Sequence, residues 1–241
     1  MTDTTSRWIR WPGYLAWIFL ALIPLSIMMV RSGNWQQGLG LYALAGLLSL
    51  GVLAWFAVQS LIPRFSEQRG VIFKRALAAV PGSVLLLMVF LGPKVPAIHD
   101  ITTDTENPPQ FEKAQSLRGD SSNPIDIKPE VIEIQREAYP DLATLQSPRS
   151  YASSFSAALA TAKRLGWEIT HEDVNAGFIE AVDTTAIMNF KDDIVIRIRT
   201  NEDGSLVDLR SVSRVGRSDL GANAKRIKAF MAAFAETAAT Q

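Results

Sequence analysis

The stretch DLRSVSRVGRSDLGANAKRI, Asp208–Ile227, gathers arginine, serine and asparagine side chains where an expected strand leads into an expected helix. Arginine guanidinium groups bind phosphate and carboxylate groups in a fixed geometry, and the N-terminus of a helix attracts anions. Ser218 or Asp219 can cap this helix. The residue types therefore predict an anion site formed by Arg210, Arg214 and the start of the helix.

A structural role is the favoured alternative for these arginines. Residues 95–146 form an acidic, proline-rich segment that we call the strap, and Val95–Leu145 within it holds ten acidic and four basic residues. Arginines on a sheet face can pair with Asp208 or with this strap if it folds over the sheet. The candidate ligand-binding residues, for which a structural role is the alternative, are Arg197, Arg210, Ser211, Ser213, Arg214, Ser218, Asp219, Asn223, His99 and Asp100.

Asn223 lies, by helical periodicity, in the middle of the apolar stripe of the last helix, between Phe230 and Phe234 in angle. A buried amide there must find hydrogen-bond partners or cost roughly 1 to 3 kcal/mol. We expect it to bond the main chain of the strap or of a sheet edge. Gly216 and Gly221 are expected to supply turn geometry or a close approach of the backbone. They are not interpreted as a phosphate-binding loop, because their spacing matches no such pattern.

Catalytic signals are weak. The chain has two histidines, and the one in the strap, His99, precedes Asp100 in a spacing that fits no named metal loop. The serines of RSVSR lack the strand-turn-helix context of an activated nucleophile. Asp192 and Asp193 are interpreted as ordinary residues of a strand-entry turn. We therefore expect no catalytic residue, no metal and no cofactor, and an enzyme is unsupported.

The N-terminal part of the chain predicts a membrane anchor in residues 1–94. Three stretches, 11–30, 38–62 and 76–93, contain no charged residue. At about 1.5 Å of rise per residue, stretches of this length match the roughly 30 Å hydrocarbon core of a bilayer. None of them has the polar face of a helix in a soluble protein. We expect three transmembrane helices.

The distribution of lysine and arginine predicts the orientation of these helices, because basic residues accumulate on the cytoplasmic side. Two lie on the side of the first loop and the tail, Arg31 and Lys94, and six lie on the side of the N-terminus: Arg7, Arg10, Arg64, Arg69, Lys74 and Arg75. The N-terminus is therefore expected in the cytoplasm. Three spans then place the C-terminal domain outside, in the periplasm if the membrane is a bacterial inner (plasma) membrane.

The charge of the exported part excludes one class of partner. From Val95 onward the chain has 16 basic and 22 acidic residues. A protein that tracks nucleic-acid phosphates needs a basic stripe. We therefore expect no nucleic-acid partner.

Residues 147–241 predict an α+β domain. A helix is expected between Ser147 and Gly166, followed by the strands WEITHED and FIEAVDTT and by the hairpin DIVIRIRT-NEDG-SLVDLRSVS. Its four-residue loop sets Thr200 opposite Ser205, and the register then sets Arg197 opposite Asp208. With the last helix, the order predicts an antiparallel meander of about four strands packed with two helices. Little regular structure is expected in the strap.

Several segments together resemble one known family: IHDITTD…NPPQF, GWEI, IEAVDTT, FKDDIVIRIR and DLRSVSRVGRSDLGANAKRI. They are similar to the family catalogued as domain of unknown function 1499 (DUF1499), over most of Ala97–Ala233, and some members of that family likewise carry membrane spans ahead of the domain. The resemblance implies a compact domain of bacterial envelopes and photosynthetic lineages. It implies no established activity, so it assigns no catalytic residue.

These expectations favour a non-catalytic, membrane-anchored envelope protein whose extracytoplasmic domain binds a partner protein or an anionic ligand. The alternative is an envelope hydrolase or transferase that uses His99 and Asp100 of the strap with the Arg/Ser-rich stretch 210–219. A transporter is the weakest hypothesis, because no span contains an interior ionisable residue.

Overall fold

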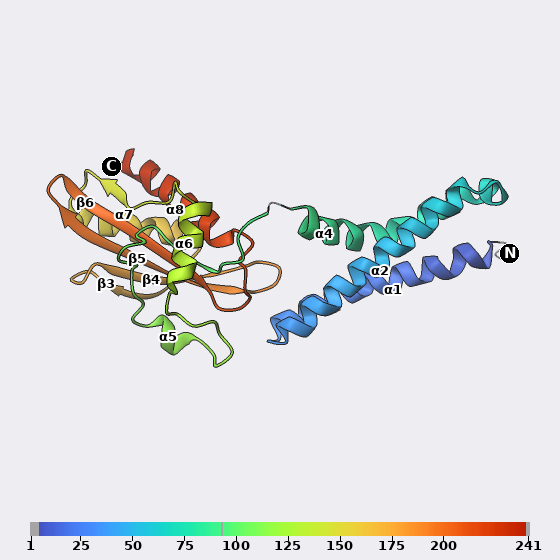
Figure 1. The fold of residues 1–241 in the computed structure, drawn as a ribbon, viewed down its shortest axis with the longest axis horizontal. Coiled ribbons are helices and arrows are strands. Elements are labelled where there is room, and N and C mark those ends of the chain that lie inside the picture. Colours follow the sequence, from blue (N-terminus) through green and yellow to red (C-terminus); the bar gives the residue numbers. More distant parts are fainter. Residues whose placement is uncertain (1–4, 93, 240–241) are drawn as a thin grey trace. The chain divides into compact units, whose positions relative to one another are not determined.

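The computed structural model describes residues 5–92 and 94–239. The chain folds into two compact units, one made by the N-terminal helices and one that contains Lys94–Ala186 and Phe190–Gln241. Figure 1 labels most of the elements of both units.

The first unit contains three helical stretches that are long and apolar enough to cross a membrane. The first is helix α1, Arg7–Arg31, and the second is helix α2, Trp35–Leu61. The third runs through Pro63–Leu91 in four pieces: 3-10 helix η1 (Pro63–Gln68), α3 (Arg69–Ala76), 3-10 helix η2 (Leu77–Ala79) and α4 (Val80–Leu91). The expectation of three long, apolar N-terminal helices is confirmed, and the third begins at Pro63, earlier than the expected residue 76.

Close packing between α2 and α4 depends on small side chains. A Cβ atom added to Gly46 would lie 3.0 Å from the carbonyl oxygen of Gly82, and one added to Gly82 would lie 2.7 Å from Oγ of Ser49. The two backbones therefore meet where bulkier residues would separate them. Away from this contact the unit presents large apolar side chains outward, for example Trp11, which is 62% exposed. Such a surface suits a bilayer rather than water.

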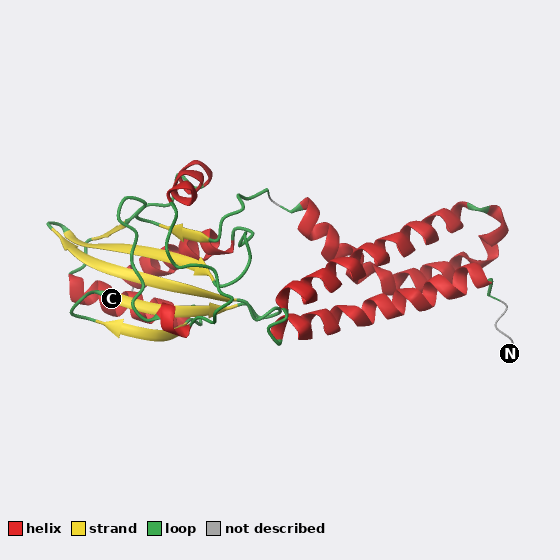
Figure 2. Ribbon diagram, turned by 60° about the horizontal axis from the view of Figure 1, so that its bottom comes forward, coloured by secondary structure: helices red, strands yellow, loops and turns green. Residues whose placement is uncertain are grey.

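The second unit is built on one antiparallel sheet of six strands in the order β1-β6-β5-β4-β3, with β2 also pairing with β6. Figure 2 shows the strands in yellow. The four longer strands are the expected meander: β3 (Glu168–Asp173), β4 (Phe178–Thr184), β5 (Lys191–Asn201) and β6 (Gly204–Ser213). The two short strands come from the strap and its end, β1 (Asp100–Thr102) and β2 (Leu145–Ser147).

The register of the β5–β6 hairpin is the predicted one. Thr200 pairs with Ser205, Ile198 with Val207, Ile196 with Leu209, and Arg197 with Asp208. Because side chains alternate across a strand, this register places the isoleucines on one face and the charged pair on the other.

The apolar face of the sheet packs against two helices, α7 (Tyr151–Arg164) and α8 (Ala222–Ala239). Ser150 caps α7 by accepting a hydrogen bond from the Ser153 N–H. Trp167 stacks on Phe230 of α8 with ring centroids 5.5 Å apart. These contacts join one hydrophobic core across the helices and the sheet.

The strap has more regular structure than its sequence indicates. Besides β1 and β2 it contains α5 (Ala114–Leu117) and α6 (Pro129–Ala138), and the expectation of little regular structure was wrong here. Pro129 occupies the first turn of α6, where its missing N–H costs nothing. The short strands exist because β6, over 50 residues away in sequence, supplies their hydrogen-bond partners.

A glutamine of α6 protects the outer edge of β1. The buried Gln135 side chain accepts a hydrogen bond from the Thr102 N–H at 2.9 Å and donates one to the Thr102 carbonyl at 2.6 Å. Its amide therefore replaces the peptide group of a neighbouring strand and closes an edge that could otherwise pair with another chain.

Candidate functional site

The sheet face opposite α7 and α8 carries charged side chains that lie buried beneath the strap. In Figure 1 the green and yellow-green segment that holds α5 and α6 crosses the sheet. A buried charged side chain destabilises a fold unless it is hydrogen-bonded and paired with an opposite charge. The buried charged residues on this face, each at most 7% exposed, are Glu180, Asp193, Arg197, Asp208 and Arg210.

Asp208 sits at the centre of the first ion cluster. Its Oδ2 accepts hydrogen bonds from Arg197 at 2.9 Å and from Arg199 at 2.7 Å. From the strap, Asp104 approaches the same two arginines, at 2.9 Å and 3.2 Å. Thr144 donates to the other oxygen of Asp208 at 2.6 Å. The predicted pairing of Arg197 with Asp208 and the strap is therefore present.

Arg210 contacts several residues of the strap. Its Nε and NH2 donate to the two oxygens of Asp100 at 3.0 Å and 2.8 Å, the bidentate geometry that arginine favours. It also donates to the carbonyl oxygens of Pro109 and Ile125, and it lies over the Phe111 ring at 5.3 Å. Because its side chain is 1% exposed, Arg210 acts as a central anchor for the strap.

Asp193 holds two further arginines. Arg214 donates to both of its oxygens, at 3.0 Å and 2.7 Å, and Arg118 of the strap donates at 2.8 Å. Burial lowers the pKa of Arg118, an effect that the Asp193 carboxylate opposes. Asp192 and Asp193 are therefore buried members of β5, and their interpretation as ordinary turn residues was wrong.

Glu180 of β4 binds the strap through main-chain groups. Its carboxylate accepts hydrogen bonds from the N–H groups of Glu112, Lys113 and Ala114 at the start of α5. The sequence offered no signal for this role, because a glutamate in an alternating strand reads as a solvent-facing residue.

Asn223 joins the last helix to the strap, as expected. The buried amide donates to the His99 carbonyl at 2.9 Å and to the Ser213 hydroxyl at 3.1 Å, and it accepts from the Ser211 hydroxyl at 2.7 Å. Arg226 also donates to Asn223 and, at 2.6 Å, to Asp192. These bonds satisfy a polar group in the core.

The same stretch fixes the main chain of residues 96–99. The Ser218 hydroxyl donates to the Pro96 carbonyl, the Asp219 N–H to the Ile98 carbonyl, and the Ser213 N–H to the His99 carbonyl. Gly216 and Gly221 adopt positive φ angles of 92° and 82°, as turn geometry requires. The Arg/Ser-rich stretch therefore positions the first segment of the strap.

Two carboxylates respond to this environment in opposite directions. Burial raises the pKa of Asp219 despite hydrogen bonds from the Gly221 and Asn223 N–H groups. For Asp104, burial also acts to raise the pKa, but the N–H groups of Asn107 and Glu106 and the nearby Arg197 and Arg199 outweigh it, so the pKa is lowered. The surroundings therefore stabilise the charged form of Asp104 and destabilise the charged form of Asp219.

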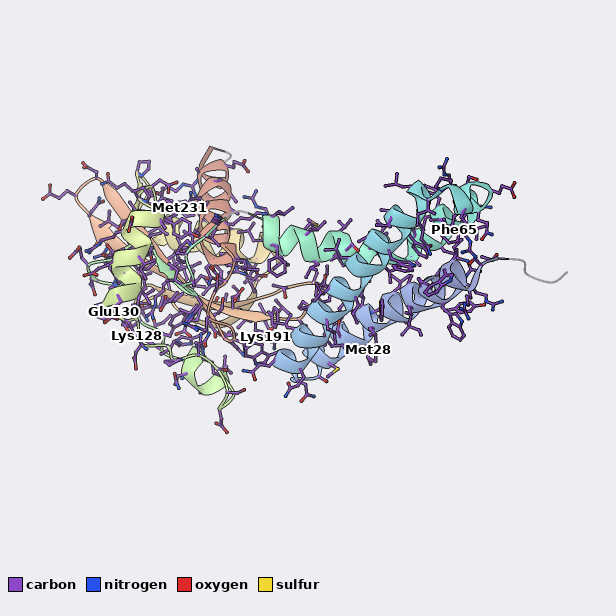
Figure 3. The ribbon with its side chains drawn as sticks, turned by 45° about the vertical axis from the view of Figure 1, so that its right-hand side comes forward. Met28, Phe65, Lys128, Glu130, Lys191 and Met231 are labelled. Atoms are coloured by element: carbon purple, nitrogen blue, oxygen red, sulfur yellow. The ribbon has the colours of Figure 1, made fainter. Side chains whose placement is uncertain are left out.

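A small open pocket lies where the fixed segment meets the start of α6. It has a volume of about 190 Å³, and its walls are formed by Ala97, Ile98, His99, Asp100, Pro124, Asp126, Lys128, Val131 and Arg217. The side chain of Asn123, the residue before Pro124, donates hydrogen bonds to the carbonyls of Ser213 and Gly216. These bonds position the side of the pocket that Pro124 lines. Lys128, labelled in Figure 3, immediately precedes α6.

The charges of this pocket leave two cations available. The side chains of Arg217 and Lys128 form no hydrogen bond or ion pair with a residue that the structure describes. Asp100 is neutralised by Arg210, and Asp126 is the second acidic group of the lining. The pocket is therefore cationic on balance and suits a small anion.

The predicted site residues divide into two groups. His99 and Asp100 line the pocket. The others anchor the strap or the segment behind the pocket, and the hydroxyl groups of Ser211 and Ser213 bond Asn223 in the core rather than facing the pocket. Arg217 and Lys128 were missed, because an exposed arginine or lysine has no distinctive spacing in the sequence. Among residues 5–92 and 94–239, no three acidic or histidine side chains group as a metal site would require.

Comparison with known proteins agrees with the family suggested by the residues. Residues 100–234 match the family described as "Protein of unknown function (DUF1499)". A search of curated proteins returned no match. The matched range includes all six strands, α7, most of α8 and the whole Arg/Ser-rich stretch. The chain therefore belongs to the DUF1499 family and carries, ahead of the family domain, three helical stretches that are long and apolar enough to span a membrane.

Proposed function

We propose that this protein is a membrane-anchored receptor domain that binds a small anionic group, of the size of phosphate or a carboxylate, in the pocket of His99, Lys128 and Arg217. The observation that carries the proposal is the contrast between arginines. Six arginines of the domain are paired with aspartates, whereas Arg217 faces the open pocket without such a partner among the described residues. The paired arginines are Arg118, Arg197, Arg199, Arg210, Arg214 and Arg226.

The size and wall chemistry of the pocket support a small ligand. A volume of about 190 Å³ lies below the several hundred Å³ typical of sites for whole drug-sized molecules. The pocket therefore suits one charged group, either free or at the end of a larger partner. The β1 segment beside it is fixed by main-chain hydrogen bonds, and such a preorganised wall lowers the entropy cost of binding.

The proposed location is the outer face of a bacterial inner membrane, with the N-terminus in the cytoplasm. The excess of lysine and arginine on the N-terminal side of the spans supports this orientation. Ala97, the first residue of the pocket, follows the end of the last apolar helix, Leu91, by six residues. A ligand at or near the membrane surface is compatible with this short connection.

The alternative of a hydrolase or transferase has less support. It requires a nucleophile beside His99 and Asp100. Asp100 is engaged by Arg210, and the serines of the stretch 210–219 that precede Arg217 bond Asn223.

Calorimetric titration of the full-length protein in detergent micelles with inorganic phosphate tests the proposal. Arg217→Gln and Lys128→Gln should each weaken binding about tenfold, because each removes one charge-assisted hydrogen bond. Both side chains are exposed, so the melting temperature should not change. Lys163→Gln is the matched control, since this exposed lysine of α7 lies outside the pocket. Equal affinity in the wild type and Arg217→Gln would refute the proposed site.

A further inference from the structure

A second cavity lies in the helical unit, at the end where α1 begins and α2 ends. It has a volume of about 410 Å³ and is lined by Trp8, Trp55, Val58, Gln59, Ile62, Arg64 and Phe65. Figure 3 labels Phe65 at this end of the unit and Met28 toward the other. The cavity is distinct from the phosphate-sized pocket of the second unit and opens on a surface that faces lipid if the three helices cross a bilayer.

The walls of this cavity are mostly apolar, and hydrogen bonds hold them in place. The rings of Trp8 and Trp55 lie with centroids 6.1 Å apart. The indole N–H of Trp55 donates to the Trp8 carbonyl at 3.1 Å, and Gln59 donates to the same oxygen at 2.8 Å. Tryptophan at a helix end is typical of the membrane interface, where its ring contacts acyl chains and its N–H meets polar groups.

A cation borders these apolar walls. The exposed Arg64 side chain lies over the Phe65 ring at 6.0 Å, and it forms no ion pair with a residue that the structure describes. Among the described residues, this end of the unit has one acidic residue, Glu67, and six basic ones: Arg7, Arg10, Arg64, Arg69, Lys74 and Arg75. A basic pocket between helices at the membrane surface attracts the phosphate of anionic lipids.

Gln59 adds an unsatisfied acceptor. Its side chain is 3% exposed and lines the cavity, and its Oε1 accepts no hydrogen bond from a described residue. An unpaired buried amide oxygen costs free energy. A ligand with a hydroxyl or ammonium donor near its phosphate would meet both Gln59 and Arg64.

We propose that this cavity binds one anionic glycerophospholipid. An acyl chain lies against Trp8, Trp55 and Val58, the phosphate pairs with Arg64, and a head-group hydroxyl donates to Gln59. Phosphatidylglycerol has this combination of a net negative charge and hydroxyl donors. Phosphatidylcholine has neither a net charge nor a head-group donor, so the cavity should discriminate between the two.

Native mass spectrometry of the full-length protein, titrated with the two lipids carrying identical acyl chains, tests this site. Phosphatidylglycerol should bind at least fivefold more tightly than phosphatidylcholine, and Arg64→Gln should remove about that factor. Lys74→Gln makes the same change of charge at an exposed lysine that does not line the cavity, and it should leave the preference intact.

A second variant separates the acyl-chain contact from the head-group contact. Val58 is 56% exposed and lines the cavity, so Val58→Ser should weaken both lipids alike. Equal affinity for the two lipids in the wild type, or an equal loss of preference in Arg64→Gln and Lys74→Gln, would overturn the proposal. Neither result would bear on phosphate binding at Arg217.

Discussion

The side-chain amide of Asn223 donates a hydrogen bond to the main-chain carbonyl of His99 across 2.9 Å, and so joins two residues 124 positions apart in the chain. Asn223 lies in the first turn of α8, and His99 immediately precedes β1. The contact ties the pocket wall to the core of the domain. It explains why an asparagine occupies the middle of an apolar helix face.

Asn223→Ala should lower the free energy of unfolding of the domain by roughly 1 to 3 kcal/mol, because it leaves buried polar partners without hydrogen bonds. Pulse proteolysis of the full-length protein in detergent, over a urea series, measures this change. Asn175→Ala is the control, since Asn175 is exposed in the turn between β3 and β4, and it should change stability by less than about 0.5 kcal/mol. If the two substitutions changed stability equally, the structural role of Asn223 would be contradicted.

Arg210→Met should destabilise the domain by about 3 to 5 kcal/mol, because it leaves the buried carboxylate of Asp100 unpaired. The double variant Arg210→Met with Asp100→Asn should recover part of that loss, since no buried charge then remains unpaired. Arg136→Met is the matched control. Arg136 pairs with Glu106 at the surface, and its removal should cost under about 1 kcal/mol. The same urea series measures all three variants, and a fully stable Arg210→Met would contradict the anchoring role.

Asp104→Asn should reveal the pH dependence of the strap contact. The hydrogen bonds and arginines around Asp104 hold its folded-state pKa below the ordinary value of 3.8. Its carboxylate therefore contributes stability that is fully present above pH of about 4 and is lost as the pH falls through the lower, folded pKa. The stability difference between the wild type and Asp104→Asn should be constant near neutral pH and should shrink below pH of about 4. Asp203→Asn, in the exposed β5–β6 turn, should show no such change, and a difference that grows at low pH would contradict the sign.

The orientation of the chain has a direct prediction. Alkaline phosphatase fused after Gln241 should be active in a bacterial host, because this enzyme folds to its active form only outside the cytoplasm. Green fluorescent protein at the same junction should remain dark when the chain is exported through the general secretion route. The opposite pair of results would reverse the orientation and move the domain to the cytoplasm.

Local sequence patterns predicted those parts of the fold that depend on neighbours in the chain. The loop Asn201–Gly204 and the alternation of isoleucines specify the hairpin register. The length and uncharged character of three N-terminal stretches predicted the long apolar helices.

The remaining features depend on contacts that no local pattern contains. Each of the two short strands, β1 and β2, needs a distant partner in β6. The pairing of Arg210 with Asp100 joins residues 110 positions apart. Glu180 and Arg217 are each a single charged residue outside any recognisable motif, so the sequence does not indicate their different roles. Glu180 is buried beneath the strap, whereas Arg217 lines a pocket. Only the placement of the strap separates these roles.

Amide hydrogen exchange of the full-length protein in detergent, with and without saturating inorganic phosphate, tests the location of the proposed site most directly. Bound phosphate should slow exchange in residues 96–100, 124–131 and 216–219, which carry the pocket walls, and Arg217→Gln should abolish this protection. Protection confined to other segments, or exchange in these three segments that phosphate leaves unchanged, would contradict the account.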